Sequence, residues 1–131
     1  MEIRRIKESD FNMLGQWWLD HEQDIPDPKI LPHDGTGGFI VNIDGTDVVA
    51  GYLYFTNASI AYIDFLISNK KYKGKDKHKA IVHAIDFMVN LALKRGCQFV
   101  WATSKISGVI NKCKELGYDL IKGHTLIYKR K

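Results

Sequence analysis

A lysine-rich turn between two different apolar segments constrains the fold of this chain more than any other feature. Residues 60–67 are an apolar run of the kind found in strands, and residues 76–95 carry apolar side chains at helical spacing. The stretch from Ser68 to Lys79 between them holds six lysines. The sequence therefore places concentrated positive charge where a strand gives way to the first turn of a long helix.

This arrangement is unfavourable unless an anion binds to it. Free backbone N–H groups and the positive end of the helix dipole already attract anions at a helix N-terminus, and each cation there costs about 0.3–1 kcal/mol. A bound polyanion such as a diphosphate would offset that cost. In the alternative interpretation, the Asp76 side chain caps the helix and the lysines form a solvated collar.

The rest of the composition indicates a single domain over residues 1–131. The chain is 45 % hydrophobic, which is enough for a substantial core. No apolar run approaches the ~20 residues of a membrane span, and the charged first residues argue against a signal peptide. Cys97 and Cys113 lack metal-type spacing, and so do the five histidines. We therefore expect a cytoplasmic protein without a metal site or a membrane partner.

Periodicity and turn residues predict a defined series of elements. The expected strands and helices are a strand at 2–7, a helix from 9 to before 26, strands at 38–43, 48–56 and 60–67, a helix at 76–95, a strand at 98–102, a helix at 107–116, and a closing hairpin of 118–121 with 125–128. A crossover helix joins neighbouring parallel strands. We therefore predict an α/β fold with a mixed, mostly antiparallel twisted sheet of about six to seven strands and helices on both faces.

This element order, with its basic turn, resembles the GNAT N-acetyltransferase superfamily over nearly the whole chain. In that family a turn written loosely as Arg/Gln-x-x-Gly-x-Gly/Ala leads into a helix whose N-terminus binds the diphosphate of acetyl-coenzyme A (acetyl-CoA). Residues 72–81 read Tyr-Lys-Gly-Lys-Asp-Lys-His-Lys-Ala-Ile and resemble the family's Tyr-Arg-Gly-Lys-Gly-Ile-Gly-x-x-Leu. Lys73 then stands at the arginine, and Asp76 and His78 replace two glycines. A second alignment begins at Lys71 and keeps Gly74 as a motif glycine.

A second motif supports the resemblance. Residues 113–118, Cys-Lys-Glu-Leu-Gly-Tyr, are similar to the family's Tyr-Glu-Lys-Leu-Gly-Phe, with Cys113 at the place of the tyrosine. The short, glycine-poor form of the basic turn also resembles chains carried by bacteriophages.

The resemblance implies acetyl-CoA as cofactor and an amine as acceptor, either a small molecule or a protein lysine or N-terminus, in a monomer or homodimer. The main chain of the strand before the turn would pair with the pantetheine arm, and the turn and helix would hold the diphosphate. The implied cofactor-binding residues are Leu66, Ile67, Ser68, Lys71, Lys73, Gly74, Lys75, Asp76, Lys77, His78 and Asn111.

Four side chains are candidates for acid–base catalysis. Asp64 lies two residues before Leu66 in an otherwise apolar or aromatic run, so burial would raise its pKa toward that of a useful base. The alternative is an exposed aspartate on the wet face of the sheet. Cys113 would replace the family's tyrosine acid or serve as a small core residue. Tyr118 and Tyr72 could supply a hydroxyl or simply pack.

The acceptor would meet the first helix and the acidic loop that follows it. Adjacent residues on a helix diverge by about 100°, so one of Trp17 and Trp18 should face the core and the other a groove or solvent. Together with Asp24 they are the candidate substrate-binding residues, because acidic groups attract amines. In the alternative, both tryptophans belong to the core or its rim.

A different functional class is also compatible with the residues. A GNAT-like fold without catalysis would use the lysine turn and the basic C-terminal residues to bind nucleic acid or another polyanion.

Overall fold

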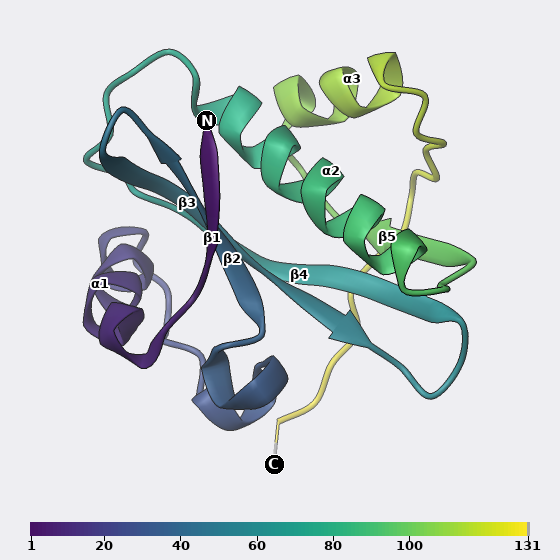
Figure 1. Cartoon of the computed structure of the whole chain (residues 1–131), viewed down its shortest axis with the longest axis horizontal. Coiled ribbons are helices and arrows are strands. Elements are labelled where there is room, and N and C mark those ends of the chain that lie inside the picture. The colour runs from purple at the N-terminus through teal and green to yellow at the C-terminus, as the bar shows by residue number, and fades with distance from the viewer. Residues whose placement is uncertain (131) are drawn as a thin grey trace.

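The computed structural model describes residues 1–130 and contains one sheet with helices on both of its faces (Figure 1). Its strands are β1 (Glu2–Arg5), β2 (Gly38–Ile43), β3 (Thr46–Phe55), β4 (Ile60–Ser68) and β5 (Phe99–Ala102). Its helices are α1 (Phe11–Asp20), α2 (Lys77–Lys94) and α3 (Ser107–Glu115), with short 3-10 turns η1 (Glu8–Asp10), η2 (Pro28–Ile30) and η3 (Pro32–Gly35).

The sheet has the mixed topology that the sequence predicts. Its five strands follow chain order, β1-β2-β3-β4-β5; the first three pairings are antiparallel and β4 pairs with β5 in parallel. The crossover through α2 makes that parallel pairing possible. The predicted fold class is confirmed, with five strands in place of the expected six to seven.

The missing strands are those of the predicted closing hairpin, which was wrong. Among the described residues, 118–130 form no strand, and the chain runs from α3 past the sheet to its C-terminal end (Figure 1). A strand needs both a ladder partner and a covered face. This segment has neither, since Leu126 and Ile127 are 82 % and 90 % exposed.

Two apolar clusters hold the helices to opposite faces of the sheet. On one face, Leu14, Trp17 and Trp18 of α1 pack with Tyr52 and Ile67 of the sheet. On the other face, α2 packs its buried stripe against β2–β5. The α2 stripe comprises Ala80, Ile81, Val82, Ala84, Ile85, Met88, Val89 and Ala92. Their spacing of three and four residues is what places them on one side of the helix.

A bulge interrupts the pairing of β3 with β4. Ala50 pairs with Ile67 and Tyr52 with Asp64, so two residues of β4 lie opposite Gly51 alone. One of these two, Phe65, has a φ of +52°, which lies in the left-handed region. Glycine permits the arrangement, because a Cβ at position 51 would lie 2.6 Å from Leu66 Cδ2. The bulge therefore depends on the absence of a side chain at Gly51.

Candidate functional site

The distal half of β4 has a free edge. The pairing with β5 ends at Ile63 and Ala102, whereas β4 continues to Ser68. Within residues 1–130 no strand pairs with the second half of β4 on that side. Apart from the Ser68 carbonyl, which contacts His21 Nε2 at 3.0 Å, the N–H and C=O groups of residues 64–68 that point away from β3 are thus available to an extended ligand, in the way that an edge strand accepts another chain.

The basic turn begins directly after this free edge and is held by one asparagine. Asn69 receives N–H donation from Lys71 at its side-chain oxygen (3.0 Å) and from Tyr72 at its carbonyl (3.1 Å). Its own side-chain amide donates to the carbonyl of Asp47 at 3.0 Å. Because Asn69 bonds both the turn and β3, the start of the lysine-rich segment is fixed relative to the sheet.

The N-terminus of α2 lies at the end of this turn and has no side-chain cap. Asp76 occupies the N-cap position, but its side chain makes no capping hydrogen bond and lies 3.8 Å from the Lys79 ammonium. The side-chain cap of the alternative interpretation is therefore absent, although Asp76 occupies the N-cap position and most of the lysines are exposed, as that interpretation expected. The N–H groups of the first helical turn remain free to bind an anion. The Asp76 carboxylate beside them repels an anion, and the positive charges of the lysines offset that repulsion.

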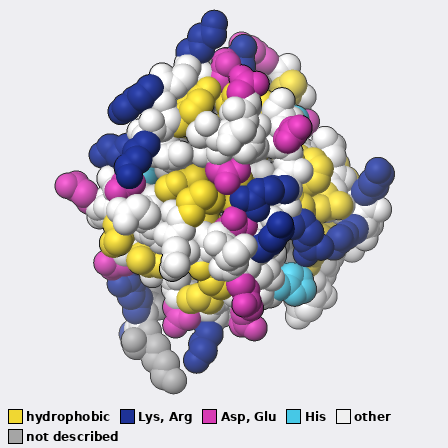
Figure 2. All heavy atoms as spheres, turned by 60° about the vertical axis from the view of Figure 1, so that its left-hand side comes forward, with side chains coloured by type: hydrophobic (Ala, Val, Ile, Leu, Met, Phe, Trp, Pro, Cys, Tyr) yellow, Lys and Arg dark blue, Asp and Glu magenta, His cyan; other side chains and the backbone are white. Residues whose placement is uncertain are grey.

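The lysines of the turn project into solvent. Lys71, Lys73 and Lys75 are exposed, whereas Lys77 is half-buried, and its pKa is lowered by burial and by the nearby charge of Lys73. Lys and Arg side chains stand out along the upper margin of the surface in Figure 2, the end of the molecule at which the β4–α2 segment lies in Figure 1. Such a group of cations raises the local concentration of anionic ligands.

The C-terminal end of α1 contacts this segment through Asp20 and His21. His21 Nε2 lies 3.0 Å from the carbonyl oxygen of Ser68 and 3.3 Å from its Oγ. Lys70 Nζ donates to the carbonyl of Asp20 at 3.3 Å. Asp20, Lys70, Lys71 and Lys73 line an open hollow of about 500 Å³. No sequence motif marks His21, because its partner is 47 residues away.

Helix α3 closes another side. A Cβ added to Gly108 in its first turn would lie 2.5 Å from His78 Nδ1, so α3 approaches the start of α2 closely. Asn111, a residue implied in cofactor binding, is exposed on α3. Within the turn, the Tyr72 ring lies over Gly74 so closely that a Cβ there would meet the ring. Gly74 is required at this position for packing, whatever it contributes to ligand binding.

Asp64 is exposed, so the burial expected from its apolar neighbours was wrong. It pairs with Tyr52 across the sheet and therefore lies on the α1 side. One carboxylate oxygen accepts the N–H of Phe65 at 2.7 Å, in the bulge itself. Sequence alternation placed Asp64 on the same face as Leu66, but the bulge breaks the alternation and turns Leu66 toward the α2 cluster. Its catalytic role stays a prediction.

Cys113 and Tyr118 lie together on the other face of the sheet. Both pack against the α2-side cluster, and the Tyr118 hydroxyl donates to Asp86 of α2 at 2.8 Å. Burial raises the pKa of both groups, and the Asp86 charge raises them further. The two side chains are therefore protonated at neutral pH. The structure brings these two candidates together and separates them from Asp64 by the thickness of the sheet.

The tryptophans do not divide between core and groove as the sequence analysis expected. Trp17 and Trp18 are only 4 % and 7 % exposed, and both belong to the α1-side core. Both therefore belong to a wide apolar face of α1 that packs against the sheet. Trp18 meets the ring of Phe65 edge-on at 6.2 Å. Asp24 is exposed and lies 3.6 Å from the Arg130 guanidinium.

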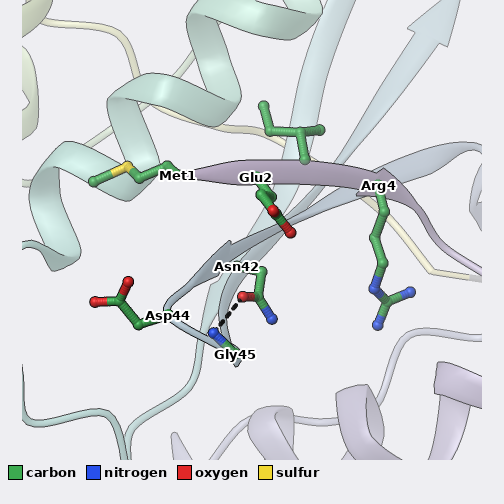
Figure 3. A pocket seen from close by; sticks show the side chains of 7 residues that line it. Met1, Glu2, Arg4, Asn42, Asp44 and Gly45 are labelled. Atoms are coloured by element: carbon green, nitrogen blue, oxygen red, sulfur yellow. Dashed lines mark hydrogen bonds between the residues drawn. The ribbon is translucent and has the colours of Figure 1, made fainter.

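A second hollow, of about 420 Å³, lies at the β1 edge of the sheet, opposite the β5 edge. Figure 3 shows its lining: Met1, Glu2, Arg4, Asn42, Asp44 and Gly45, with Asn42 accepting the Gly45 N–H at 2.9 Å. Its lining contains no histidine or cysteine. Across residues 1–130, no three His, Cys, Asp or Glu side chains are arranged to hold a metal, and no helix has the length and apolar character to span a membrane.

Comparisons with known proteins agree on the fold. No protein-family model and no curated protein sequence matches the chain. Solved structures do match. An acetyltransferase from Trypanosoma brucei aligns with a TM-score of 0.62 at 15 % identity, over 98 % of this chain and 99 % of that one.

Two further structures match over similar shares. The aminoglycoside acetyltransferase AAC(6')-Iy, in complex with the bisubstrate analogue CoA-S-monomethyl-acetylneamine, aligns with a TM-score of 0.57 at 15 % identity, over 99 % of this chain and 97 % of that one. A protein from Bacillus halodurans C-125 described as a transcriptional regulator aligns with a TM-score of 0.64 at 16 % identity, over 97 % and 99 %. These likenesses show that the chain has the fold of the GNAT acetyltransferases, as the sequence predicts.

Proposed function

We propose that this protein is an acyl-CoA-dependent N-acetyltransferase that transfers acetyl from acetyl-CoA to an amine. One observation carries the proposal: the free edge of β4 leads through the lysine turn to the uncapped N-terminus of α2. An extended polar arm followed by a diphosphate matches this order of groups. Solved structures of the same fold that contain CoA or a CoA-based analogue support the same ligand.

Different residues would bind different parts of the coenzyme. The main chain of Leu66, Ile67 and Ser68 would pair with the amide groups of the pantetheine arm, because β4 is unpaired there on one side. The diphosphate would meet the N–H groups of the first turn of α2 and the ammonium groups of the turn. The residues proposed for the diphosphate are Lys71, Lys73, Gly74, Lys75, Asp76, Lys77 and His78, with Asn111 beside them on α3.

The reaction is a direct displacement. The nitrogen of the neutral amine attacks the thioester carbonyl carbon, a C–N bond forms, the C–S bond breaks, and the amine loses one proton while the departing sulfur gains one. An alkylamine has a pKa of about 10 and is protonated at neutral pH, so a proton must leave it before attack. A main-chain N–H at the free edge of β4 would stabilise the negative charge that develops on the carbonyl oxygen.

The two faces of the sheet suit the two proton transfers. Asp64, exposed on the α1 side, would accept the proton of the amine or pass it to water. Cys113 and Tyr118, protonated on the α2 side, would supply a proton to the sulfur. The departing thiol has an ordinary pKa of about 8.5, so this acid assists the step without being essential. The amine would thus arrive from one face and the coenzyme would leave along the other.

Calorimetry with a charge-reversal pair tests the proposal. Lys73→Glu with Lys75→Glu removes two exposed cations from the turn, whereas Lys29→Glu with Lys94→Glu makes the same change of net charge far from it. We expect the wild type and the control pair to bind acetyl-CoA at low ionic strength with similar heats. The Lys73/Lys75 pair should bind at least tenfold more weakly, and its affinity should depend less on salt.

A wild-type protein that releases no heat with acetyl-CoA would end the transferase assignment. If the same sample bound duplex DNA tightly, the polyanion-binding module would replace it. Equal weakening by the two charge-reversal pairs would show that the lysine turn attracts anions only through the net charge of the protein.

A further inference from the structure

The α1 side of the sheet carries a connected group of aromatic rings beside Asp64. Tyr54 and Tyr62 pair across β3 and β4, and their rings stack with centroids 4.6 Å apart at an interplanar angle of 2°. Trp101 of β5 pairs with Tyr62 and meets its ring at 6.3 Å. We call Tyr54, Tyr62 and Trp101 the aromatic surface. Directly paired residues point to the same face, so all three rings lie on the side where Asp64 lies.

The Tyr54 end of this surface packs against the α1-side cluster, whereas Trp101 at its other end is exposed. Helix α1 packs over the other end of the strands, at Tyr52 and Ile67, and the Tyr54 hydroxyl donates to the carbonyl of Ile30 in η2 at 2.9 Å. Trp101 stays 55 % exposed, although β5 contains no charged residue. Trp101 is thus an exposed ring beside the half-buried Tyr54 and Tyr62, and such an arrangement is typical of a ligand-binding surface.

A negative charge lies at the edge of the aromatic surface. Asp64 follows Tyr62 by two residues, and its charge contributes, after burial and the neighbouring Tyr62, to raising the pKa of Tyr54. Its second carboxylate oxygen makes no hydrogen bond among the described residues. Ring faces beside a carboxylate are a recognised environment for an ammonium group. The chain already contains such a contact on its other face, where the Arg95 guanidinium lies 5.5 Å from the Phe55 ring centroid.

The aromatic surface also lies where an acceptor must approach. The pairing of β4 with β5 ends at Ile63 and Ala102, next to Tyr62 and Trp101. Helix α2 covers the other face of these strands, so an amine reaches the free edge of β4 from the α1 side. The path to that edge therefore passes over the rings and Asp64.

We propose that the acceptor is a primary amine on an apolar alkyl or aryl arm, whose arm lies on Tyr62 and Trp101 and whose ammonium group meets Asp64. The proposal rests on the function proposed above and names its substrate class. The surface presents aromatic rings and one carboxylate, and few groups that could hydrogen-bond the hydroxyls of a sugar-like amine. A polyhydroxylated amine would lose its water without replacement hydrogen bonds there, so it should be a poor acceptor.

Acetylation assays with three amines test this inference on the full chain. The probes are 2-phenylethylamine, n-hexylamine and neamine, with thiol release as the readout. We expect the first two to be acetylated with a higher kcat/KM than neamine. Trp101→Ala should raise the KM for 2-phenylethylamine about three- to tenfold and leave the KM for acetyl-CoA unchanged, whereas Trp101→Phe should keep most of the affinity. The control is Phe55→Ala, which removes a similarly exposed ring from the opposite face.

Amine binding without coenzyme separates this inference from the proposed function. Trp17 and Trp18 are buried, so a change in tryptophan fluorescence on adding 2-phenylethylamine should come from Trp101 and vanish in Trp101→Phe. Acetyl-CoA binding with no fluorescence response, a KM unaffected by Trp101→Ala, or a preference for neamine would each overturn the inference and leave the transferase assignment in place. Failure of acetyl-CoA to bind, with the fluorescence response intact, would overturn the transferase assignment instead.

Discussion

Replacing Gly51 with alanine should disturb the bulge between β3 and β4, which lies beside the free edge of β4. The new Cβ would lie 2.6 Å from Leu66 Cδ2 and 3.0 Å from Met88 Cε, so Leu66 must move. Overpacking of this kind costs about 1–3 kcal/mol, while the less flexible unfolded chain returns about 0.4–1 kcal/mol. The net loss is then about 1–2 kcal/mol. In a domain of this size it corresponds to a fall in melting temperature of roughly 3–10 °C.

The same substitution should weaken acetyl-CoA binding, because Leu66 carries part of the main chain proposed to pair with the pantetheine arm. Loss of one such hydrogen bond, at about 0.5–1.5 kcal/mol, lowers the affinity roughly two- to tenfold. Thermal melts and calorimetry on one sample measure both effects. Val41→Ala is the matched control, since Val41 is fully buried in β2 and its truncation costs about 2 kcal/mol away from the bulge.

The control should melt at a similarly lowered temperature and bind acetyl-CoA as the wild type does. A Gly51→Ala protein that melts at the expected lower temperature but binds acetyl-CoA with unchanged affinity would contradict a link between the bulge and the coenzyme site. The bulge would then be a packing feature with no part in the site.

Three further outcomes follow from the structure. Arg4 donates to the Asp10 carboxylate at 2.8 Å and lowers its pKa, so Asp10 stabilises the fold at pH values above its unfolded pKa of about 3.9. In urea unfolding, this contribution to the free energy of unfolding should vanish as the pH falls through the folded pKa, and Asp10→Asn should remove that pH dependence. Tyr118→Phe removes a hydroxyl bonded to Asp86 and should cost about 0.5–1.5 kcal/mol; absorbance titration should also lose one tyrosine that ionises well above pH 10, and an unchanged titration would contradict the contact. Trp17→Ala should cost about 3–5 kcal/mol in chemical denaturation, whereas an exposed Trp17 would cost well under 1 kcal/mol.

Local patterns predict most of the elements because their signals lie close together in the chain. The apolar spacing of α2 and the glycine at position 96 place that helix within a residue of its bounds in the structure. The alternation and the turn at Asp44-Gly45 similarly predict the hairpin of β2 and β3. The lysine turn is visible for the same reason, since all six of its cations lie within residues 70–79.

The features that the sequence did not predict depend on contacts between distant residues. The bulge exists because Gly51 lies opposite Leu66, and neither residue by itself predicts a bulge. His21 meets Ser68 across 47 residues, and Asp86 meets Tyr118 across 32. The closing hairpin was predicted from a strand-like pattern that is present in the chain. A strand-like sequence pattern does not guarantee a partner strand, and residues 118–130 have no partner strand in the described structure.

Amide chemical shifts of the 15N-labelled protein during an acetyl-CoA titration report where the coenzyme binds. If the free edge of β4 and the N-terminus of α2 hold the coenzyme, residues 66–68 and 73–79 should shift, with little change at the β1-edge hollow shown in Figure 3. Shifts confined to that hollow, or none at all at low ionic strength, would contradict this placement of the coenzyme.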